Sequence, residues 1–220
     1  RNPYDVSGFY SPAWLAWASA PLALFPPQMG GVLLFAANLF AYAYVAGKVK
    51  PNFFLFALTG IPIAWNSLLA NINGLSLAGI FLPAPIGLVL LSLKPQTGLT
   101  LAVWKLYMDW TEGKKREVAY AALVILVLVA FAFIAYPDWM DKMLTATGND
   151  YNASLWPYAF PVGVLLFYQA IRKRELRYAL MACCLVTPYL TWHTWAYFAI
   201  GLFSLNMKFG RNKNDQAADG

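Results

Sequence analysis

Seven apolar runs follow one another along the chain, separated by short polar gaps. They are Met29–Gly47, Phe53–Ala70, Gly74–Leu93, Thr97–Trp110, Val118–Tyr136, Trp156–Ile171 and Tyr178–Met207. A helix needs about 20 apolar residues to cross a bilayer, since it rises about 1.5 Å per residue. Met29–Gly47 and Val118–Tyr136 reach this length. Tyr178–Met207 is too long for one span, and Thr187-Pro188 interrupts it, so we expect two spans there that meet near residues 188–193.

Two segments are expected to depart from simple spans. Gly74–Leu93 carries Pro83-Ala84-Pro85 at its middle, which predicts a broken or re-entrant segment that dips in and returns. The alternative is an ordinary helix with a kink. Backbone that is not helical at membrane depth is tolerated only inside protein or beside a cavity, so such a segment tends to mark a site. The run Trp14–Leu24 is short and bounded by prolines, which predicts a helix lying at the interface.

Composition places these runs in a membrane. Hydrophobic residues make up 60% of the 220 residues and charged residues 12%, with a mean hydropathy of +0.52. A soluble domain carries roughly 25% charged residues. The sequence therefore predicts an all-α, polytopic transmembrane helical bundle of about seven spans. We expect residues 1–211 to form a single transmembrane domain and residues 212–220 to form a disordered tail.

The net charge of +6 is concentrated in the gaps between apolar runs. This distribution is the positive-inside pattern of cytoplasmic loops and argues against nucleic-acid binding. We therefore expect an integral protein of a prokaryotic plasma membrane, with its C-terminus in the cytoplasm and membrane lipids as partners. Four clusters hold 12 of the 16 basic residues: Lys48/Lys50, Lys114–Arg116, Arg172–Arg174 with Arg177, and Lys208/Arg211/Lys213.

Metal and cofactor chemistry has little support in the sequence. The adjacent Cys183 and Cys184 lie in an apolar run and are expected to be buried packing residues. One histidine and two cysteines cannot build a Cys/His zinc site. The chain also lacks GxGxxG, P-loop, HExxH and CxxC motifs, so we expect no cofactor and no metal.

Two basic side chains are candidates for binding an anion. Lys94 interrupts the apolar stretch in Lys94-Pro95-Gln96, and a lysine near membrane depth is costly and therefore a functional candidate. The alternative is a lysine that reaches out to the interface. His193, the only histidine, could donate to a phosphate or carry a proton, or it could be bonded between helix ends.

Four short motifs, in order along the chain, resemble the family 87 membrane glycosyltransferases of the GT-C class. Asn-Pro-Tyr-Asp-Val, followed by Phe-Tyr-Ser-Pro and Pro-Leu-Ala-Leu-Phe-Pro, is similar to the "PYD…YPP…PLALLP" stretch of that family. Lys94-Pro95-Gln96 is similar to its KPQ motif. The segment 148–156 resembles "NxSLxG", and the segment 187–193 resembles "SPxSWxHH".

This resemblance implies a function and a set of site residues. The family transfers a sugar, commonly mannose, from a polyprenyl-phosphate donor to an extracytoplasmic lipid or glycan acceptor, with inversion. The resemblance implies that Lys94, Gln96 and His193 bind the donor phosphate and that Asp5 is the catalytic base. The residues expected to orient the substrate are Asn73, Asn152, Trp192 and Tyr10.

The chain departs from the family pattern at several points. Thr194 replaces the second histidine of the last motif, Asn73-Gly74 stands where Gly-Gln is usual, and no segment before Arg1 corresponds to the usual Asp-bearing loop. The resemblance therefore implies an N-terminally incomplete or reduced member, inactive if the base is missing. Two other functions stay open. One is a non-catalytic integral membrane subunit that packs against protein partners, and the other is a small transporter or flippase for a lipid-linked substrate.

Overall fold

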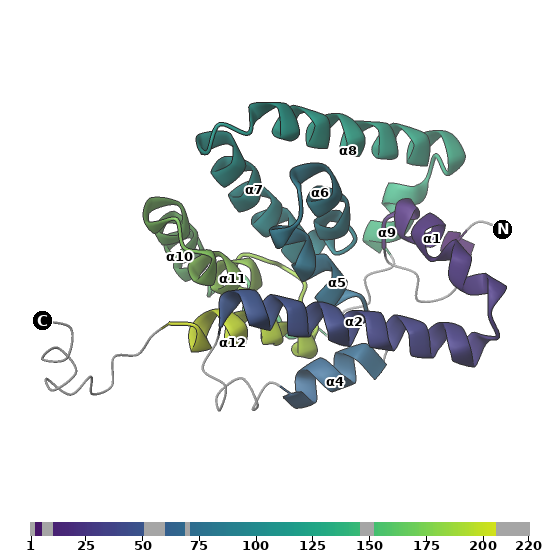
Figure 1. Ribbon diagram of the computed structural model, residues 1–220, viewed down its shortest axis with the longest axis horizontal. Coiled ribbons are helices and arrows are strands. Elements are labelled where there is room, and N and C mark those ends of the chain that lie inside the picture. Colours follow the sequence, from purple (N-terminus) through teal and green to yellow (C-terminus); the bar gives the residue numbers. More distant parts are fainter. Residues whose placement is uncertain (1–2, 6–10, 51–59, 69–70, 146–151, 206–220) are drawn as a thin grey trace, which may run out of the picture.

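The computed structural model describes residues 3–5, 11–50, 60–68, 71–145 and 152–205, and every regular element in these ranges is a helix (Figure 1). Four α-helices carry a proline at their first or second residue, where the missing N–H would have no partner anyway: Pro27, Pro85, Pro95 and Pro161. The elements are η1 Pro3–Asp5, α1 Ala13–Ser19, η2 Ala20–Leu24, α2 Pro27–Val49, α4 Gly60–Leu68, α5 Asn73–Ala78, η3 Gly79–Phe81, α6 Ala84–Ser92, α7 Pro95–Thr111, α8 Lys115–Ala135, α9 Trp139–Thr145, α10 Phe160–Lys173, α11 Leu176–Leu185, η5 Trp192–Trp195 and α12 Ala196–Phe203.

Two helices are long and apolar enough to cross a membrane. They are α2, with 23 residues, and α8, with 21. Large apolar side chains of α8, among them Leu126 and Ile134, are exposed, and only 11% of its most apolar window is buried. Apolar surface of this extent is typical of contact with lipid. These helices indicate association with a membrane and match the predicted runs Met29–Gly47 and Val118–Tyr136.

The prediction of about seven full spans is not confirmed, because the other described helices are shorter. The run Trp156–Ile171 contains α10, with 14 residues, which ends where Arg174 adopts a left-handed conformation with φ 55°. The run Tyr178–Met207 does divide near Pro188, as predicted, but into helices of 10 and 8 residues. Residues 186–191 between them form no helix. Much of Phe53–Ala70 and the predicted tail 212–220 lie outside the described residues.

The segment Gly74–Leu93 breaks and reverses direction, as the sequence predicts. Helix α5 continues into η3, the chain turns at Leu82-Pro83, and α6 runs back beside them. The Ser76 hydroxyl donates to the Leu91 carbonyl at 3.3 Å across this hairpin. Each arm has nine helical residues, or about 14 Å. The hairpin lies between α2, which packs on α5, and α8, which packs on α6 (Figure 1).

Three of the four basic clusters lie at one end of the molecule. Lys114 and Arg174 line the same cavity, and so does Phe81 at the tip of the hairpin. The Phe81 ring contacts Tyr44, and the Lys48 ammonium lies over the Tyr44 ring. The fourth cluster lies outside the described residues. This arrangement agrees with the predicted assignment of the basic loops to a single side of a membrane.

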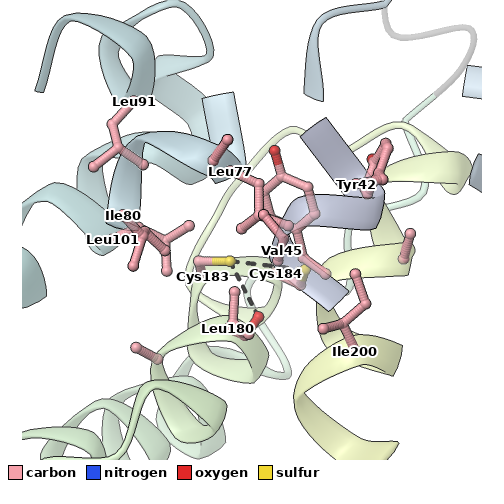
Figure 2. Packing of buried hydrophobic residues seen from close by; sticks show 14 of the residues in the cluster. Tyr42, Val45, Leu77, Ile80, Leu91, Leu101, Leu180, Cys183, Cys184 and Ile200 are labelled. Atoms are coloured by element: carbon pink, nitrogen blue, oxygen red, sulfur yellow. Dashed lines mark hydrogen bonds between the residues drawn. The ribbon is translucent and has the colours of Figure 1, made fainter. Parts of the chain in front are cut away.

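The main core joins the hairpin to the C-terminal helices (Figure 2). Tyr42 and Val45 of α2 pack with Leu77 of α5, and these residues meet Leu180 and Ile200 of α11 and α12. Cys183 and Cys184 are fully buried in this core and are free thiols, so their prediction as packing residues is confirmed.

The close contact between the end of α6 and the first turn of α7 requires a glycine at position 98. A Cβ at Gly98 would lie 1.8 Å from the Leu91 carbonyl oxygen, whereas a Cβ at Gly31 would meet nothing within 4 Å. We expect Gly98→Ala to lower the free energy of unfolding by about 1–3 kcal/mol, since the helices must separate. Gly31→Ala should be neutral or stabilising by up to about 1 kcal/mol. Unfolding of both variants in detergent measures the difference, and equal stability would contradict the close α6–α7 contact.

Candidate functional site

Segments that are distant in the sequence meet around the first turn of α7. The Thr187 hydroxyl donates to the Gln96 carbonyl, which joins the 187–195 segment to Lys94-Pro95-Gln96. The Asn73 amide donates to Thr194 Oγ1 at 3.0 Å, and the Tyr197 hydroxyl donates to the Asn73 carbonyl. The structure therefore brings together Lys94, Gln96, Asn73 and the last predicted motif.

Asn152 holds the 187–190 loop in place. Its Nδ2 donates to the Pro188 carbonyl at 3.0 Å, and its Oδ1 accepts the Leu190 N–H at 3.0 Å. The neighbouring Ser154 hydroxyl donates to the Thr187 carbonyl at 2.5 Å. The sequence predicted that Asn152 orients the substrate. In this structure its amide bonds to the backbone of that loop, and its contact with a substrate stays a prediction.

Two side chains lie within hydrogen-bonding distance of His193 Nε2. The Asn71 amide nitrogen lies 2.8 Å and the Thr191 hydroxyl 2.9 Å from this atom. A chain of hydroxyls extends away from it, since Thr191 Oγ1 lies 2.8 Å from Thr194 Oγ1, which in turn accepts from Asn73. With the Asn71 amide assigned in this way, two donors point at Nε2, and the ring proton of a neutral His193 is on Nδ1.

Lys94 is a cation without a counter-charge. It precedes Pro95 at the start of α7 and is partly exposed. Among the side chains that the structure describes, none forms a hydrogen bond or an ion pair with its ammonium. Burial lowers the pKa of Lys94 to about 8, and burial together with the Lys94 charge lowers the pKa of His193 to about 4. At neutral pH, Lys94 is therefore charged and His193 is neutral.

Several buried polar atoms near Lys94 and His193 have no hydrogen-bond partner within the described part of the chain. Buried polar groups without partners are costly and uncommon in native structures. His193 Nδ1 is a donor, the three amide oxygens are acceptors, and Thr97 Oγ1 can serve as either. These atoms are Asn71 Oδ1, Asn73 Oδ1, Gln96 Oε1, Thr97 Oγ1 and His193 Nδ1.

A small cavity lies among these groups. It has a volume of about 20 Å³ and is lined by Lys94, Gln96, Thr97 and the segment 189–191, together with Thr194. A cavity of this size holds about one water molecule. The sequence predicted that Lys94 and His193 reach one cavity. Lys94 lines it, whereas His193 does not and reaches it only through its partner Thr191, which lines the cavity together with Thr194.

The other predicted site residues lie at the edge of the site or outside the described part of the chain. Trp192 is 45% exposed, and its ring packs against His193 and the exposed Trp65. Tyr10 and the side chain of Asp5 lie outside the described residues. Tyr4, next to Asp5, packs against a cluster that includes Ile72 and Leu93, the neighbours of Asn73 and Lys94.

Two features of the structure were not predicted as functional. One is Asn71, the partner of His193, since nothing in the sequence connects residues that lie 122 positions apart. Lys105 and Asp109 form a buried ion pair, with 3.0 Å between Nζ and Oδ2. The sequence does contain a signal for this pair, because opposite charges four residues apart in an apolar run lie on one face of a helix.

Within the described residues, no group of three or more histidine, cysteine, aspartate or glutamate side chains could hold a metal ion. The described donor atoms of the site are amides, hydroxyls, an imidazole and an ammonium. No family model, no curated protein and no solved structure matches the chain. The resemblance to the family 87 glycosyltransferases therefore stays a prediction.

The lowered pKa of Lys94 predicts a pH dependence of stability. Between its folded pKa of about 8 and its ordinary value of 10.5, the unfolded chain binds more protons than the folded protein. Stability should therefore rise with pH across this window, by about 3 kcal/mol at about 1.4 kcal/mol per pKa unit. Lys94→Met removes this contribution. We expect the difference in unfolding free energy between Lys94→Met and wild type to shrink from pH 7 to pH 10.5, and a constant difference would contradict the desolvation of Lys94.

Proposed function

We propose that this chain is a membrane glycosyltransferase of the GT-C type, or the donor-binding portion of one. It transfers a sugar from a polyprenyl-phosphate donor to a lipid or glycan acceptor on the extracytoplasmic side. The observation that carries the proposal is the Lys94 ammonium, which has no partner among the described side chains, beside a neutral His193 whose Nδ1 also has none there. Two donors without acceptors suit an anion, and a phosphate oxygen accepts from both.

The amide groups suit the sugar that the phosphate carries. Gln96 Oε1, Asn73 Oδ1 and Asn71 Oδ1 are acceptors without partners in the described residues. Sugar hydroxyls are donors of the matching kind. The exposed pair Trp65 and Trp192 offers aromatic faces at the edge of the site.

The proposed reaction breaks the bond between the anomeric carbon and the phosphate oxygen. The acceptor hydroxyl attacks the anomeric carbon from the opposite face, and its proton passes to a carboxylate base. Both electrons of the broken bond stay on the phosphate, where Lys94 and the Nδ1–H of His193 stabilise the developing charge. Asp5 is the base in this proposal, in line with the family resemblance.

A donor head group is larger than the cavity beside Lys94. The 189–191 segment and Thr194 form one wall of that cavity. Hydrogen bonds to Asn152 and Asn73 hold this wall, and its Leu190 packs in the main core. Binding in this proposal displaces the wall and replaces its contacts with contacts to the donor.

Removing the Lys94 charge tests the phosphate site. We expect Lys94→Met to bind farnesyl phosphate about 10- to 100-fold more weakly than wild type, since a hydrogen bond to a charged group contributes about 1.5–3 kcal/mol. Lys48→Met removes a charge at the opposite end of the molecule and should leave affinity unchanged. Titration of the detergent-solubilised protein with farnesyl phosphate, and with farnesol as the uncharged control, gives the comparison.

Two results would count against the enzyme. Equal affinity of wild type and Lys94→Met for farnesyl phosphate would show that Lys94 does not bind the phosphate. Equal affinity for farnesol and farnesyl phosphate would show that only the isoprenoid is bound. Either result favours the alternative of a non-catalytic membrane subunit.

The proposed topology makes a separate prediction. The two ends of α10 should lie on opposite sides of the membrane, with Lys173 among the cytoplasmic basic residues. Tyr158, just before α10, is 91% exposed, and the native cysteines are buried. In intact cells, a membrane-impermeant maleimide should label Tyr158→Cys and spare Lys173→Cys. Labelling of both from outside would reject the orientation.

A further inference from the structure

A second cavity, of about 500 Å³, opens at the end of the molecule that carries the basic clusters. Its apolar walls come from Phe81 and Leu82 at the tip of the hairpin, Trp104 and Met108 of α7, and Leu176 at the start of α11. A volume of this size suits a small organic ligand. The cavity also lies beside the first residues of α8, where a candidate span begins, which is the level of a lipid head group.

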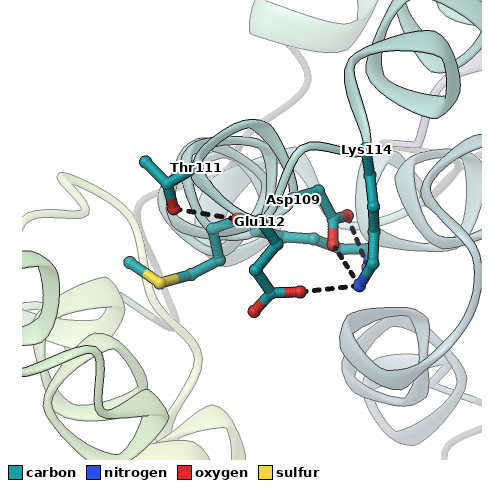
Figure 3. A network of polar contacts seen from close by, with 6 residues as sticks. Asp109, Thr111, Glu112 and Lys114 are labelled. Atoms are coloured by element: carbon teal, nitrogen blue, oxygen red, sulfur yellow. Dashed lines mark hydrogen bonds and ion pairs between the residues drawn. The ribbon is translucent and has the colours of Figure 1, made fainter.

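The floor of this cavity is a closed network of charges. Asp109 forms an ion pair with Lys105 at 3.0 Å. Lys114 forms ion pairs with Asp109 at 3.5 Å and with Glu112 at 2.7 Å (Figure 3). Lys105 and Asp109 are each only 6% exposed. Gly87 leaves room for this pair, because a Cβ there would lie 2.9 Å from Lys105 Cε. Each charge of the floor already has an opposite charge beside it.

Two further charges line the cavity without partners. The side chains of Glu117, in the first turn of α8, and Arg174, between α10 and α11, form no hydrogen bond or ion pair with the described residues. They have opposite signs and come from different helices. The cavity lining therefore offers one free anion and one free cation next to an apolar wall.

The balance of charge selects the class of ligand. The lining carries three basic and three acidic side chains, so a purely anionic head group would face as many carboxylates as cations. A head group with both a phosphate and an ammonium matches the two free charges. The carboxylate of Glu117 favours a primary ammonium, which donates N–H bonds, over a quaternary one, which has none.

We propose that this cavity binds an aminophospholipid of the phosphatidylethanolamine type. Its phosphate lies at Arg174, its ammonium lies at Glu117, and the start of its acyl chains packs on Phe81 and Trp104. The site is independent of the sugar donor, because it lies at the opposite end of α7 from Lys94.

Calorimetric titration with dihexanoyl phospholipids tests the head group. We expect dihexanoyl phosphatidylethanolamine to bind at least fivefold more tightly than the phosphatidylcholine or phosphatidylglycerol with the same chains. Free phosphoethanolamine should bind more weakly than the lipid, since it lacks the apolar part. The proposal is overturned by equal or tighter binding of either competing lipid, by equally tight binding of free phosphoethanolamine, or by no binding of any lipid.

Two exposed variants test the assignment of charges. Arg174→Gln and Glu117→Gln should each weaken phosphatidylethanolamine binding at least fivefold and leave the fold unchanged. Arg116→Gln is the matched control, because Arg116 lies next to Glu117 in sequence but does not line the cavity. Glu117→Gln should also remove the advantage of phosphatidylethanolamine over phosphatidylcholine of the same chain length, since Glu117 selects the primary ammonium, whereas Arg174→Gln should weaken both lipids. If Arg174→Gln and Arg116→Gln behave alike, the binding is a general response to surface charge and the proposed site is wrong.

Discussion

A single buried amide holds the start of the hairpin. Asn38 of α2 is fully buried, and its Oδ1 accepts the N–H groups of Gly74 and Leu75 at 2.7 and 3.3 Å. Its Nδ2 donates to Ser67 of α4 at 2.7 Å. The first N–H groups of a helix have no partner within it, and burying them unpaired is costly. The long helix therefore fixes where α5 begins, which in turn places Asn73 against Thr194 and Asn71 against His193.

Lys94, the N-cap of α7, and Lys105, within α7, show two outcomes for a lysine in apolar surroundings. Lys94 and Lys105 are 11 residues apart, or about 16 Å along the helix. Lys105 meets a carboxylate one turn further on, and this pair is buried with its charge neutralised. Lys94 has no such partner among the described side chains, so burial acts on it uncompensated and lowers its pKa. The difference is the reason why the proposed anion site is placed at Lys94, whereas Lys105 belongs to a network of paired charges.

Much of the backbone could be predicted, because it depends on local features. The apolar runs that form α2 and α8 are long and free of proline, so these helices reach spanning length. Pro83 and Pro85 cannot continue a helix from the residues before them, and the hairpin turns there. The lengths of α10, α11 and α12 could not be predicted, because their ends depend on contacts with other segments. The loop at 187–190, for example, is held by Asn152.

The sequence by itself determined that the chain is helical and carries long apolar segments, and it singled out Lys94 and His193 as candidates, since these features depend on composition, proline positions and isolated charges. Only the tertiary structure decided which of those residues meet. Asn71 and His193 are 122 positions apart, and their contact follows from the packing of α4 and the hairpin against η5 and α12. The sequence also could not show that Lys94 has no counter-charge among the described side chains or that Asn152 holds a loop. Hydrogen bonding and desolvation depend on distances of a few ångströms between side chains, and the spacing of residues along the sequence does not give these distances.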